Sequence, residues 1–120
     1  MEIVYFNLKE HIAALQEIIR PCFKEETGIQ YHMFESYLEY PFKMTHKKAI
    51  LFYNAWDGDA VYRIKRIVSQ QGKQIFLVAL CLDDQQGINA LEHGCDYALL
   101  LPFHKQQVVR CCLYLAKKHE

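Results

Sequence analysis

Three short apolar runs stand out along the chain, and each is followed by polar residues and then by a helical pattern. They span residues 49–54, 75–80 and 97–101. Each run is apolar at consecutive positions, which is typical of strands buried on both faces of a parallel sheet. A similar run at residues 3–6 and a weaker one at residues 29–34 complete a predicted set of five strands.

Apolar residues at helical spacing follow four of these five strands. A first helix is expected from about residue 9, and Pro21 should kink or end it because proline removes a backbone donor. The apolar positions of the other three helices are Val61, Ile64, Ile67 and Val68 in one, Ile88 and Leu91 in the next, and Val108, Val109, Cys112, Leu115 and Ala116 in the last, expected over residues 104–118. Strands that alternate with helices favour a parallel sheet with helices on both faces.

The segment at residues 35–48 has no clear period. It is rich in aromatic residues, is interrupted by Pro41 and ends in a basic stretch. We expect a short helix and a surface loop there. Its aromatic residues, together with Tyr31 and Phe34, either form an exposed docking patch or pack over the edge of the sheet.

Size and charge narrow the class of protein. A chain of 120 residues forms one domain, and its fourteen basic and fourteen acidic residues cancel. A neutral chain lacks the basic surface that nucleic-acid binding requires. No apolar run approaches the roughly 20 residues that span a bilayer, and the first residues do not resemble a secretion signal. We therefore expect a cytoplasmic protein with reduced cysteines and no binding to nucleic acid or membrane.

Residues 94–103, GCDYALLLPF, resemble the GADDYLxKPF segment of two-component response-regulator receiver domains. The two segments agree in length and at the glycine, aspartate, leucine, proline and phenylalanine. Residues 49–67 are similar to the family's phosphoacceptor strand and the helix after it, and residues 75–84 to its fourth strand and loop. The resemblance implies one receiver-like domain over residues 1–120, with the flavodoxin-like strand order 2-1-3-4-5.

The positions that carry the family's chemistry hold other residues here. The acid pair that binds Mg²⁺ matches Phe6 and Asn7, and the phosphoacceptor aspartate matches Asn54. The family's serine or threonine at the end of strand 4 matches Ala79. The lysine that precedes the proline in the family's segment matches Leu101. An amide is no acyl-phosphate nucleophile, and a leucine cannot neutralise a phosphoryl group. The resemblance therefore implies a degenerate receiver, or pseudo-receiver, that is not an enzyme and holds no metal or cofactor.

Three functions fit such a chain. The first is a signalling module that acts by protein contact, without phosphorylation. The second is a sensor that binds a small molecule in the emptied pocket, which we expect Asn7, Asn54, Ala79 and Leu101 to line. The third keeps phosphotransfer on a relocated acid such as Asp57, and it is the least favoured.

For the contact function, the resemblance implies a homodimer through helix 4, strand 5 and helix 5, with a further signalling protein as a possible partner. The residues predicted for this surface are His93, Asp96, His104, Lys105, Gln106 and Arg110. Asp96 and Arg110 are expected to form a reciprocal charge pair across a two-fold axis.

Two groups of residues have alternative interpretations. Asp57, Asp59, Asp83 and Asp84 either cap two helices or form a cation site, and capping is favoured because it needs only local geometry. Among the cysteines, Cys81 lies near a helix start that could lower its pKa, although an inert thiol is favoured there too. The neighbouring pair at residues 111 and 112 fits simple packing better than redox sensing.

Overall fold

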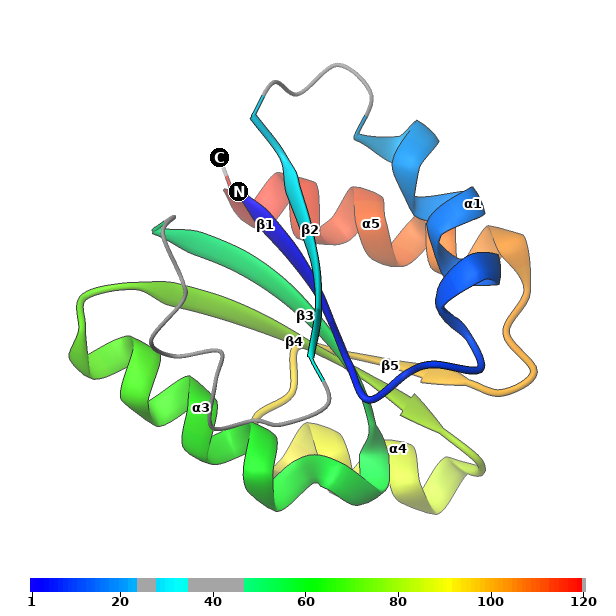
Figure 1. Ribbon diagram of the computed structural model, residues 1–120. Coiled ribbons are helices and arrows are strands. Elements are labelled where there is room, and N and C mark those ends of the chain that lie inside the picture. The colour runs from blue at the N-terminus through cyan, green and yellow to red at the C-terminus, as the bar shows by residue number, and fades with distance from the viewer. Residues whose placement is uncertain (24–27, 35–46, 120) are drawn as a thin grey trace.

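The computed structural model describes residues 1–23, 28–34 and 47–119, with the side chains of residues 34 and 116–119 left out (Figure 1). The strands are β1 (Glu2–Phe6), β2 (Gln30–Phe34), β3 (Lys48–Asn54), β4 (Gln74–Cys81) and β5 (Tyr97–Leu100). The helices are α1 (Ile12–Cys22), α3 (Gly58–Gln70), α4 (Asp84–Glu92) and α5 (Lys105–His119), and a short 3-10 turn, η1 (Ala55–Asp57), precedes α3.

The five strands form one sheet in the order β2-β1-β3-β4-β5, and every neighbouring pair is parallel. This confirms the predicted flavodoxin-like order. The predicted strands agree with the observed ones to within one residue at each end. The helix and loop expected at residues 35–48 fall almost entirely outside the described residues.

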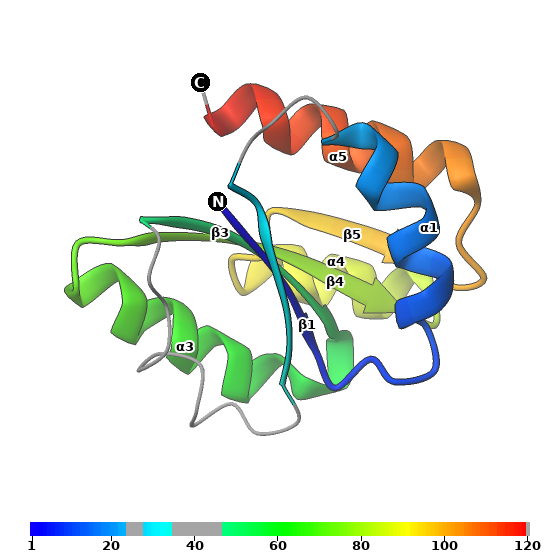
Figure 2. The same ribbon diagram turned by 45° about the horizontal axis from the view of Figure 1, so that its top comes forward.

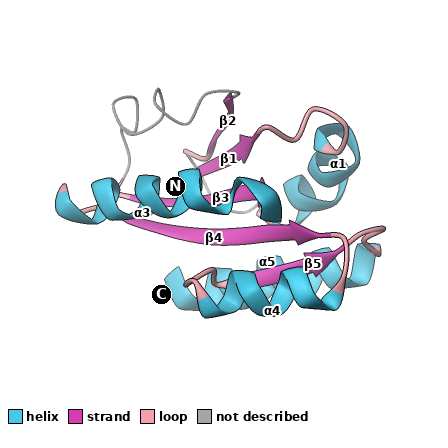
Figure 3. Cartoon of the chain, turned by 90° about the horizontal axis from the view of Figure 1, so that it is seen from below, coloured by secondary structure: helices cyan, strands magenta, loops and turns pink. Residues whose placement is uncertain are grey.

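Helices cover both faces of the sheet (Figure 2). Side chains of α1 and α5 pack on one face, and those of α3 and α4 pack on the other. Figure 3 shows α3 and α4 in front of the strands when the molecule is seen from below, with α5 behind β5. The sheet is thus the middle layer of three.

The two central strands divide their side chains between these faces. Leu51 and Tyr53 of β3 belong to the cluster under α3 and α4, whereas Ile50 and Phe52 belong to the cluster under α1 and α5. In β4 the alternation continues from residue 75 to residue 81, and all seven side chains are buried. Burial on both faces is why these strands read as unbroken apolar runs.

Helix α4 differs from the sequence pattern in the face that it buries. Gly87 and Ala90 face the sheet, whereas Ile88 is 50% and Leu91 52% exposed. These small residues bring α4 close to β5, and a Cβ added at Gly87 would make an ordinary van der Waals contact, 3.7 Å from the Cβ of Ala98. In α3 the predicted stripe is confirmed apart from Ile67, which is 38% exposed.

The first turn of α4 is closed by a side-chain cap. Asp83 precedes the helix, and its Oδ1 accepts a hydrogen bond of 2.8 Å from the backbone N–H of Gln86. Of the two aspartates expected at this helix start, Asp83 is therefore the cap and Asp84 is the first helical residue. Within the described residues, no helix is both long enough and apolar enough to cross a bilayer.

The cap gives a stability prediction. We expect Asp83→Ala to lower the free energy of unfolding by about 1 kcal/mol, because the N–H of Gln86 loses its acceptor. Asp84→Ala removes the same charge from the same helix end but no cap, so its loss should be clearly smaller. Urea denaturation of both variants measures this, and equal losses would contradict the assignment of Asp83 as the cap.

Candidate functional site

Two asparagines meet where β1 and β3 end. Asn54 is the last residue of β3, and Asn7 directly follows β1. The two strands are neighbours, with Phe6 opposite Tyr53, so their carboxyl ends lie side by side. Asn54 Nδ2 donates a hydrogen bond of 3.0 Å to the backbone carbonyl of Asn7. The backbone of Asn7 is in the left-handed region, with a φ of 53°. Asparagine tolerates this conformation better than most residues.

The amide of Asn54 is nearly inaccessible, and only one of its two ends is satisfied. The side chain is 6% exposed, and its Oδ1 is buried without a hydrogen-bond partner. Because Nδ2 is directed to the carbonyl of Asn7, the orientation of the amide is fixed and Oδ1 points elsewhere. An unpaired buried acceptor is unusual in a folded protein and marks this position as a candidate binding site.

A cavity of about 220 Å³ adjoins the two asparagines. Its walls come from the end of β1, the loop before α1 and the turn after β3, and its lining residues are Asn7, Leu8, Lys9, Glu10, His11, Asn54 and Trp56. Sequence reasoning identified the two asparagines but not the other five, because their approach depends on loop conformations that no local pattern specifies.

Three of the predicted pocket positions lie elsewhere. Phe6 and Ala79 are buried in the core cluster under α3 and α4. Leu101 is half-buried on the opposite face, in contact with the cluster under α1 and α5. The structure therefore brings Asn7 and Asn54 together and does not bring Ala79 or Leu101 into their cavity.

The acids near this edge act separately. Asp57 occupies the position before α3 but makes no side-chain cap; instead its Oδ2 accepts a hydrogen bond of 3.3 Å from Asn7 Nδ2. Asp59 lies in the first turn of α3, and Asp83 caps α4. Within the described part of the chain, no three histidine, cysteine, aspartate or glutamate side chains are grouped so that they could hold a metal ion.

A second cavity, of about 190 Å³, lies between α3 and α4. Tyr62 is one of its lining residues: the Tyr62 hydroxyl lies 3.3 Å from that of Tyr53, and the ring stacks on His93 with centroids 5.7 Å apart. Gly58 allows this arrangement, because a Cβ there would lie 3.1 Å from the Tyr62 ring. Trp56, which is 58% exposed, lines both cavities. Nothing in the sequence alone indicated this second cavity.

Most residues predicted for the contact surface are exposed. His104, Lys105, Gln106 and Arg110 lie at the start of α5 and face solvent. His93 is exposed at the end of α4, where its Nδ1 lies 2.6 Å from the carbonyl oxygen of Asn89.

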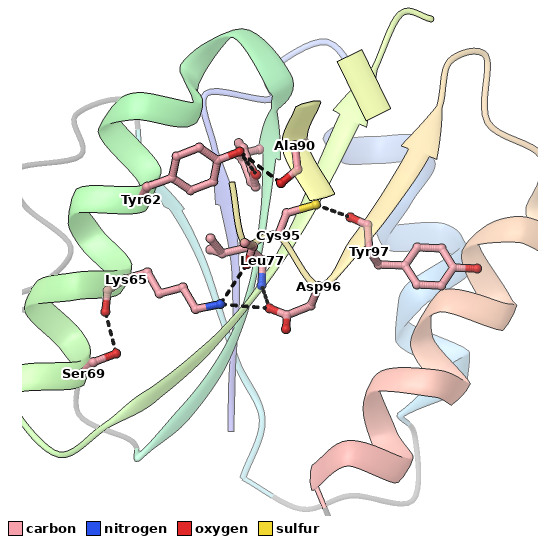
Figure 4. Close-up of polar contacts among 10 residues, drawn as sticks. Tyr62, Lys65, Ser69, Leu77, Ala90, Cys95, Asp96 and Tyr97 are labelled. Atoms are coloured by element: carbon pink, nitrogen blue, oxygen red, sulfur yellow. Dashed lines mark hydrogen bonds and ion pairs between the residues drawn. The ribbon is translucent and has the colours of Figure 1, made fainter. Parts of the chain in front are cut away.

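Asp96 makes hydrogen bonds and an ion pair with other residues of the chain (Figure 4). Its backbone N–H donates to the carbonyl of Leu77, and its Oδ2 accepts a hydrogen bond of 2.8 Å from the N–H of Leu77. Lys65 Nζ lies 3.5 Å from the same oxygen and donates to the carbonyl of Gly94 at 3.0 Å. The carboxylate thus extends the pairing of β4 with β5 and attaches α3 to it. Asp96 therefore has a structural role within the chain.

The five cysteines are free thiols. Cys81 is the last residue of β4 and is buried. Burial raises the pKa of its thiol, so the suggestion that the nearby helix start lowers this pKa is wrong. Burial also raises the pKa of Cys111 to about 12 and that of Cys95 to about 11. Neutral, buried thiols are poor nucleophiles, which supports the packing interpretation.

The amide of Asn54 generates a prediction with a defined pH dependence. In Asn54→Asp, a carboxylate oxygen replaces the amide donor that faces the carbonyl of Asn7. We therefore expect the free energy of unfolding to fall by roughly 1–3 kcal/mol at pH 7. Repulsion and burial raise the pKa of the new carboxyl in the folded state. The loss should therefore be small below about pH 4, the usual pKa of aspartate, and should grow as the pH rises.

Asn89→Asp is the matched control, because it adds the same charge at an exposed position. Urea denaturation from about pH 3, which is below the usual aspartate pKa, up to about pH 7 compares the free energies of unfolding of the two variants. A loss at Asn54→Asp that does not change with pH would contradict a charge-dependent penalty at this position.

Several solved structures with the same architecture are response-regulator receiver domains. A receiver protein from Pseudoalteromonas atlantica matches with a TM-score of 0.71 and 14% identity, covering 100% of both chains. The receiver domain of a DNA-binding response regulator from Colwellia psychrerythraea 34H matches with a TM-score of 0.75 and 12% identity, covering 98% of each chain.

A third match has a regulatory description of its own. It is described as an atypical orphan response regulator with a phosphorylation-independent regulatory mechanism, and it aligns with a TM-score of 0.64 and 14% identity over 92% of this chain and 90% of its own. No protein-family model and no curated protein sequence matches the chain. The strand order, the flanking helices and these structural matches together show that the chain has the flavodoxin-like fold of response-regulator receiver domains.

Proposed function

We propose that this chain is a receiver-like signalling module that acts through protein contact and does not depend on phosphorylation. The observation that carries the proposal is the amide of Asn54. At the position where the receiver resemblance places the phosphoacceptor carboxylate, the chain has a buried amide that donates to the carbonyl of Asn7. Such a group neither attacks a phosphoryl donor nor provides the charge that holds Mg²⁺.

The neighbouring positions support the same conclusion. Phe6 and Ala79 belong to the core cluster under α3 and α4, and Leu101 packs against the separate cluster under α1 and α5. These side chains contribute packing, and none of them can bind a phosphoryl oxygen through a charge or a hydroxyl group. The matched structure of an atypical regulator with a phosphorylation-independent mechanism gives a precedent on the same fold.

The surface of α4, β5 and α5 is the contact face that we propose for a homodimer. Large apolar side chains are exposed on all three elements: Ile88, Leu91, Leu100, Leu113 and Tyr114. Tyr114 of α5 also meets Tyr97 of β5, with ring centroids 5.8 Å apart. Apolar side chains surrounded by polar and charged ones are typical of protein–protein interfaces. Here the polar surroundings include Lys105, Gln106 and Arg110 on α5.

The loss of phosphotransfer is tested with a small phosphodonor. After incubation with acetyl phosphate and Mg²⁺, intact-mass measurement should show no added phosphoryl group, because the position of the acceptor holds an amide. A stable adduct would overturn the proposal. If the adduct formed on the wild-type chain and disappeared in Asp57→Asn, the relocated-acid function would replace it.

The contact face is tested by the state of association. Sedimentation equilibrium over a range of protein concentrations should show a dimer, and Arg110→Glu should weaken it by reversing a charge at the edge of the apolar surface. Arg66→Glu makes the same change at an exposed position of α3, which is not part of the proposed contact surface, and should leave the dimer unchanged. A monomer at all concentrations, or equal effects of the two variants, would contradict the proposed face.

A further inference from the structure

The cavity between α3 and α4 contains side chains that the proposed contact function does not use. It measures about 190 Å³, whereas a water molecule occupies roughly 30 Å³ in the liquid. The cavity therefore admits a group of several heavy atoms. Its lining comes from η1, from the first turns of α3 and from the side of α4 that includes residues 86, 89, 90 and 93.

Tyr62 connects the two helices that form this cavity. Its hydroxyl lies 3.5 Å from the carbonyl oxygen of Ala90 in α4 (Figure 4), and its ring is nearly parallel to that of His93, with an interplanar angle of 6°. One side chain of α3 thus contacts both the last turn of α4 and the residue that follows it. A cavity whose walls are joined in this way needs little rearrangement to accept a ligand.

The charge in the lining comes from Asp59. Among the described lining residues it is the only carboxylate, and none of them is a lysine or an arginine. Burial raises the pKa of Tyr62, and the nearby charge of Asp59 raises it further, so this charge acts inside the cavity. Within the described part of the chain, Asp59 forms no ion pair. The cavity therefore favours a cation.

His93 provides an acceptor at the same cavity. Its Nδ1 lies 2.6 Å from the carbonyl oxygen of Asn89, and a carbonyl only accepts, so Nδ1 carries the hydrogen. In the neutral ring the other nitrogen, Nε2, then has a lone pair and accepts. The ligand that suits both His93 and Asp59 is thus a cation that donates N–H groups.

Trp56 distinguishes between the cations that donate N–H groups. Its side chain lines the cavity and is 58% exposed, so the indole is available to a ligand. An indole face attracts cations. A guanidinium group is planar and weakly hydrated, so it can stack on this face while its N–H groups donate in its own plane. An ammonium group is compact and strongly hydrated, and it cannot stack.

We propose that this cavity binds a guanidinium group, which donates hydrogen bonds to the carboxylate of Asp59 and to Nε2 of His93 and stacks on the indole of Trp56. The guanidinium group is the end of an arginine side chain. Its source is either an arginine of a partner protein or free arginine, and the same chemistry recognises both. The site is separate from the proposed homodimer and does not depend on it.

The test uses the single tryptophan of the chain. Trp56 gives the only tryptophan fluorescence and the only indole N–H signal in a ¹⁵N spectrum. N-acetyl-arginine amide, which represents an arginine within a protein, and free arginine are titrated into the full chain in parallel. N-acetyl-citrulline amide is the matched control, because a neutral urea group of the same shape replaces the guanidinium. N-acetyl-lysine amide keeps the charge but not the plane.

We expect at least one of the two arginine compounds to saturate the signal. The citrulline and lysine compounds should bind at least about tenfold more weakly, because the first loses its charge and the second its stacking. Tighter binding of the amide indicates a protein as the source, and tighter binding of free arginine indicates the free amino acid. No saturation by either, or equal binding of citrulline or lysine, would overturn the proposal.

Two charge-removing variants locate the site. Asp59→Asn keeps the shape of an exposed side chain and should weaken binding by about tenfold or more. Asp84→Asn removes the same charge from an exposed position at the start of α4, outside the lining, and should have a clearly smaller effect. Equal effects of the two variants would show a general attraction to acidic surface and would overturn the site.

The wild-type chain gives an independent location. Trp56 also lines the cavity beside Asn54, so its signal alone does not separate the two cavities. The imidazole ¹⁵N signals of His93, which lines only the cavity between α3 and α4 of these two, should shift on binding. Unchanged His93 signals at saturation would overturn the location. Since binding is measured independently of association, failure of this site and failure of the proposed dimer are distinguishable.

Discussion

A parallel sheet with apolar central strands must be covered on both sides, and this requirement determines most of the molecule. Strands β3 and β4 direct alternate side chains to opposite faces, so α1 and α5 are needed on one side and α3 and α4 on the other. Because every neighbouring pair of strands is parallel, their carboxyl ends gather at one edge. The loops that connect strands to covering helices leave from that edge, and they form the cavity beside Asn54.

Where strand pairing begins or ends, polar side chains form hydrogen bonds with backbone groups of this sheet and its loops. At the carboxyl edge, Asn54 fixes the loop after β1 by donating to Asn7. At the amino end of β5, Asp96 provides the acceptor that continues the ladder with Leu77, and Lys65 joins α3 to it. Both side chains stabilise the fold, and of these two the amide keeps a buried oxygen without a hydrogen-bond partner.

The strands were predictable from the sequence because consecutive apolar residues are themselves the mark of two-sided burial. The resemblance to receivers correctly identified the strand order and the meeting of Asn7 with Asn54. It did not predict the outward face of α4, since the spacing of Ile88 and Leu91 indicates a helix but not the close approach that makes Gly87 its inner residue. The cavity walls were missed for a similar reason: loop residues such as Trp56 reach the site through tertiary structure alone.

The outer strand β5 also limits how this protein can aggregate. An outer strand has backbone N–H and C=O groups on its free side, and these can pair with a strand of another molecule and begin a fibre. Strand β5 has four residues, and the chain turns away into a proline directly after Leu101. A foreign strand would gain very few hydrogen bonds along so short an edge. The brevity of β5 is therefore a safeguard: it lets the chain expose apolar side chains for a partner beside that edge without offering the edge itself as a template.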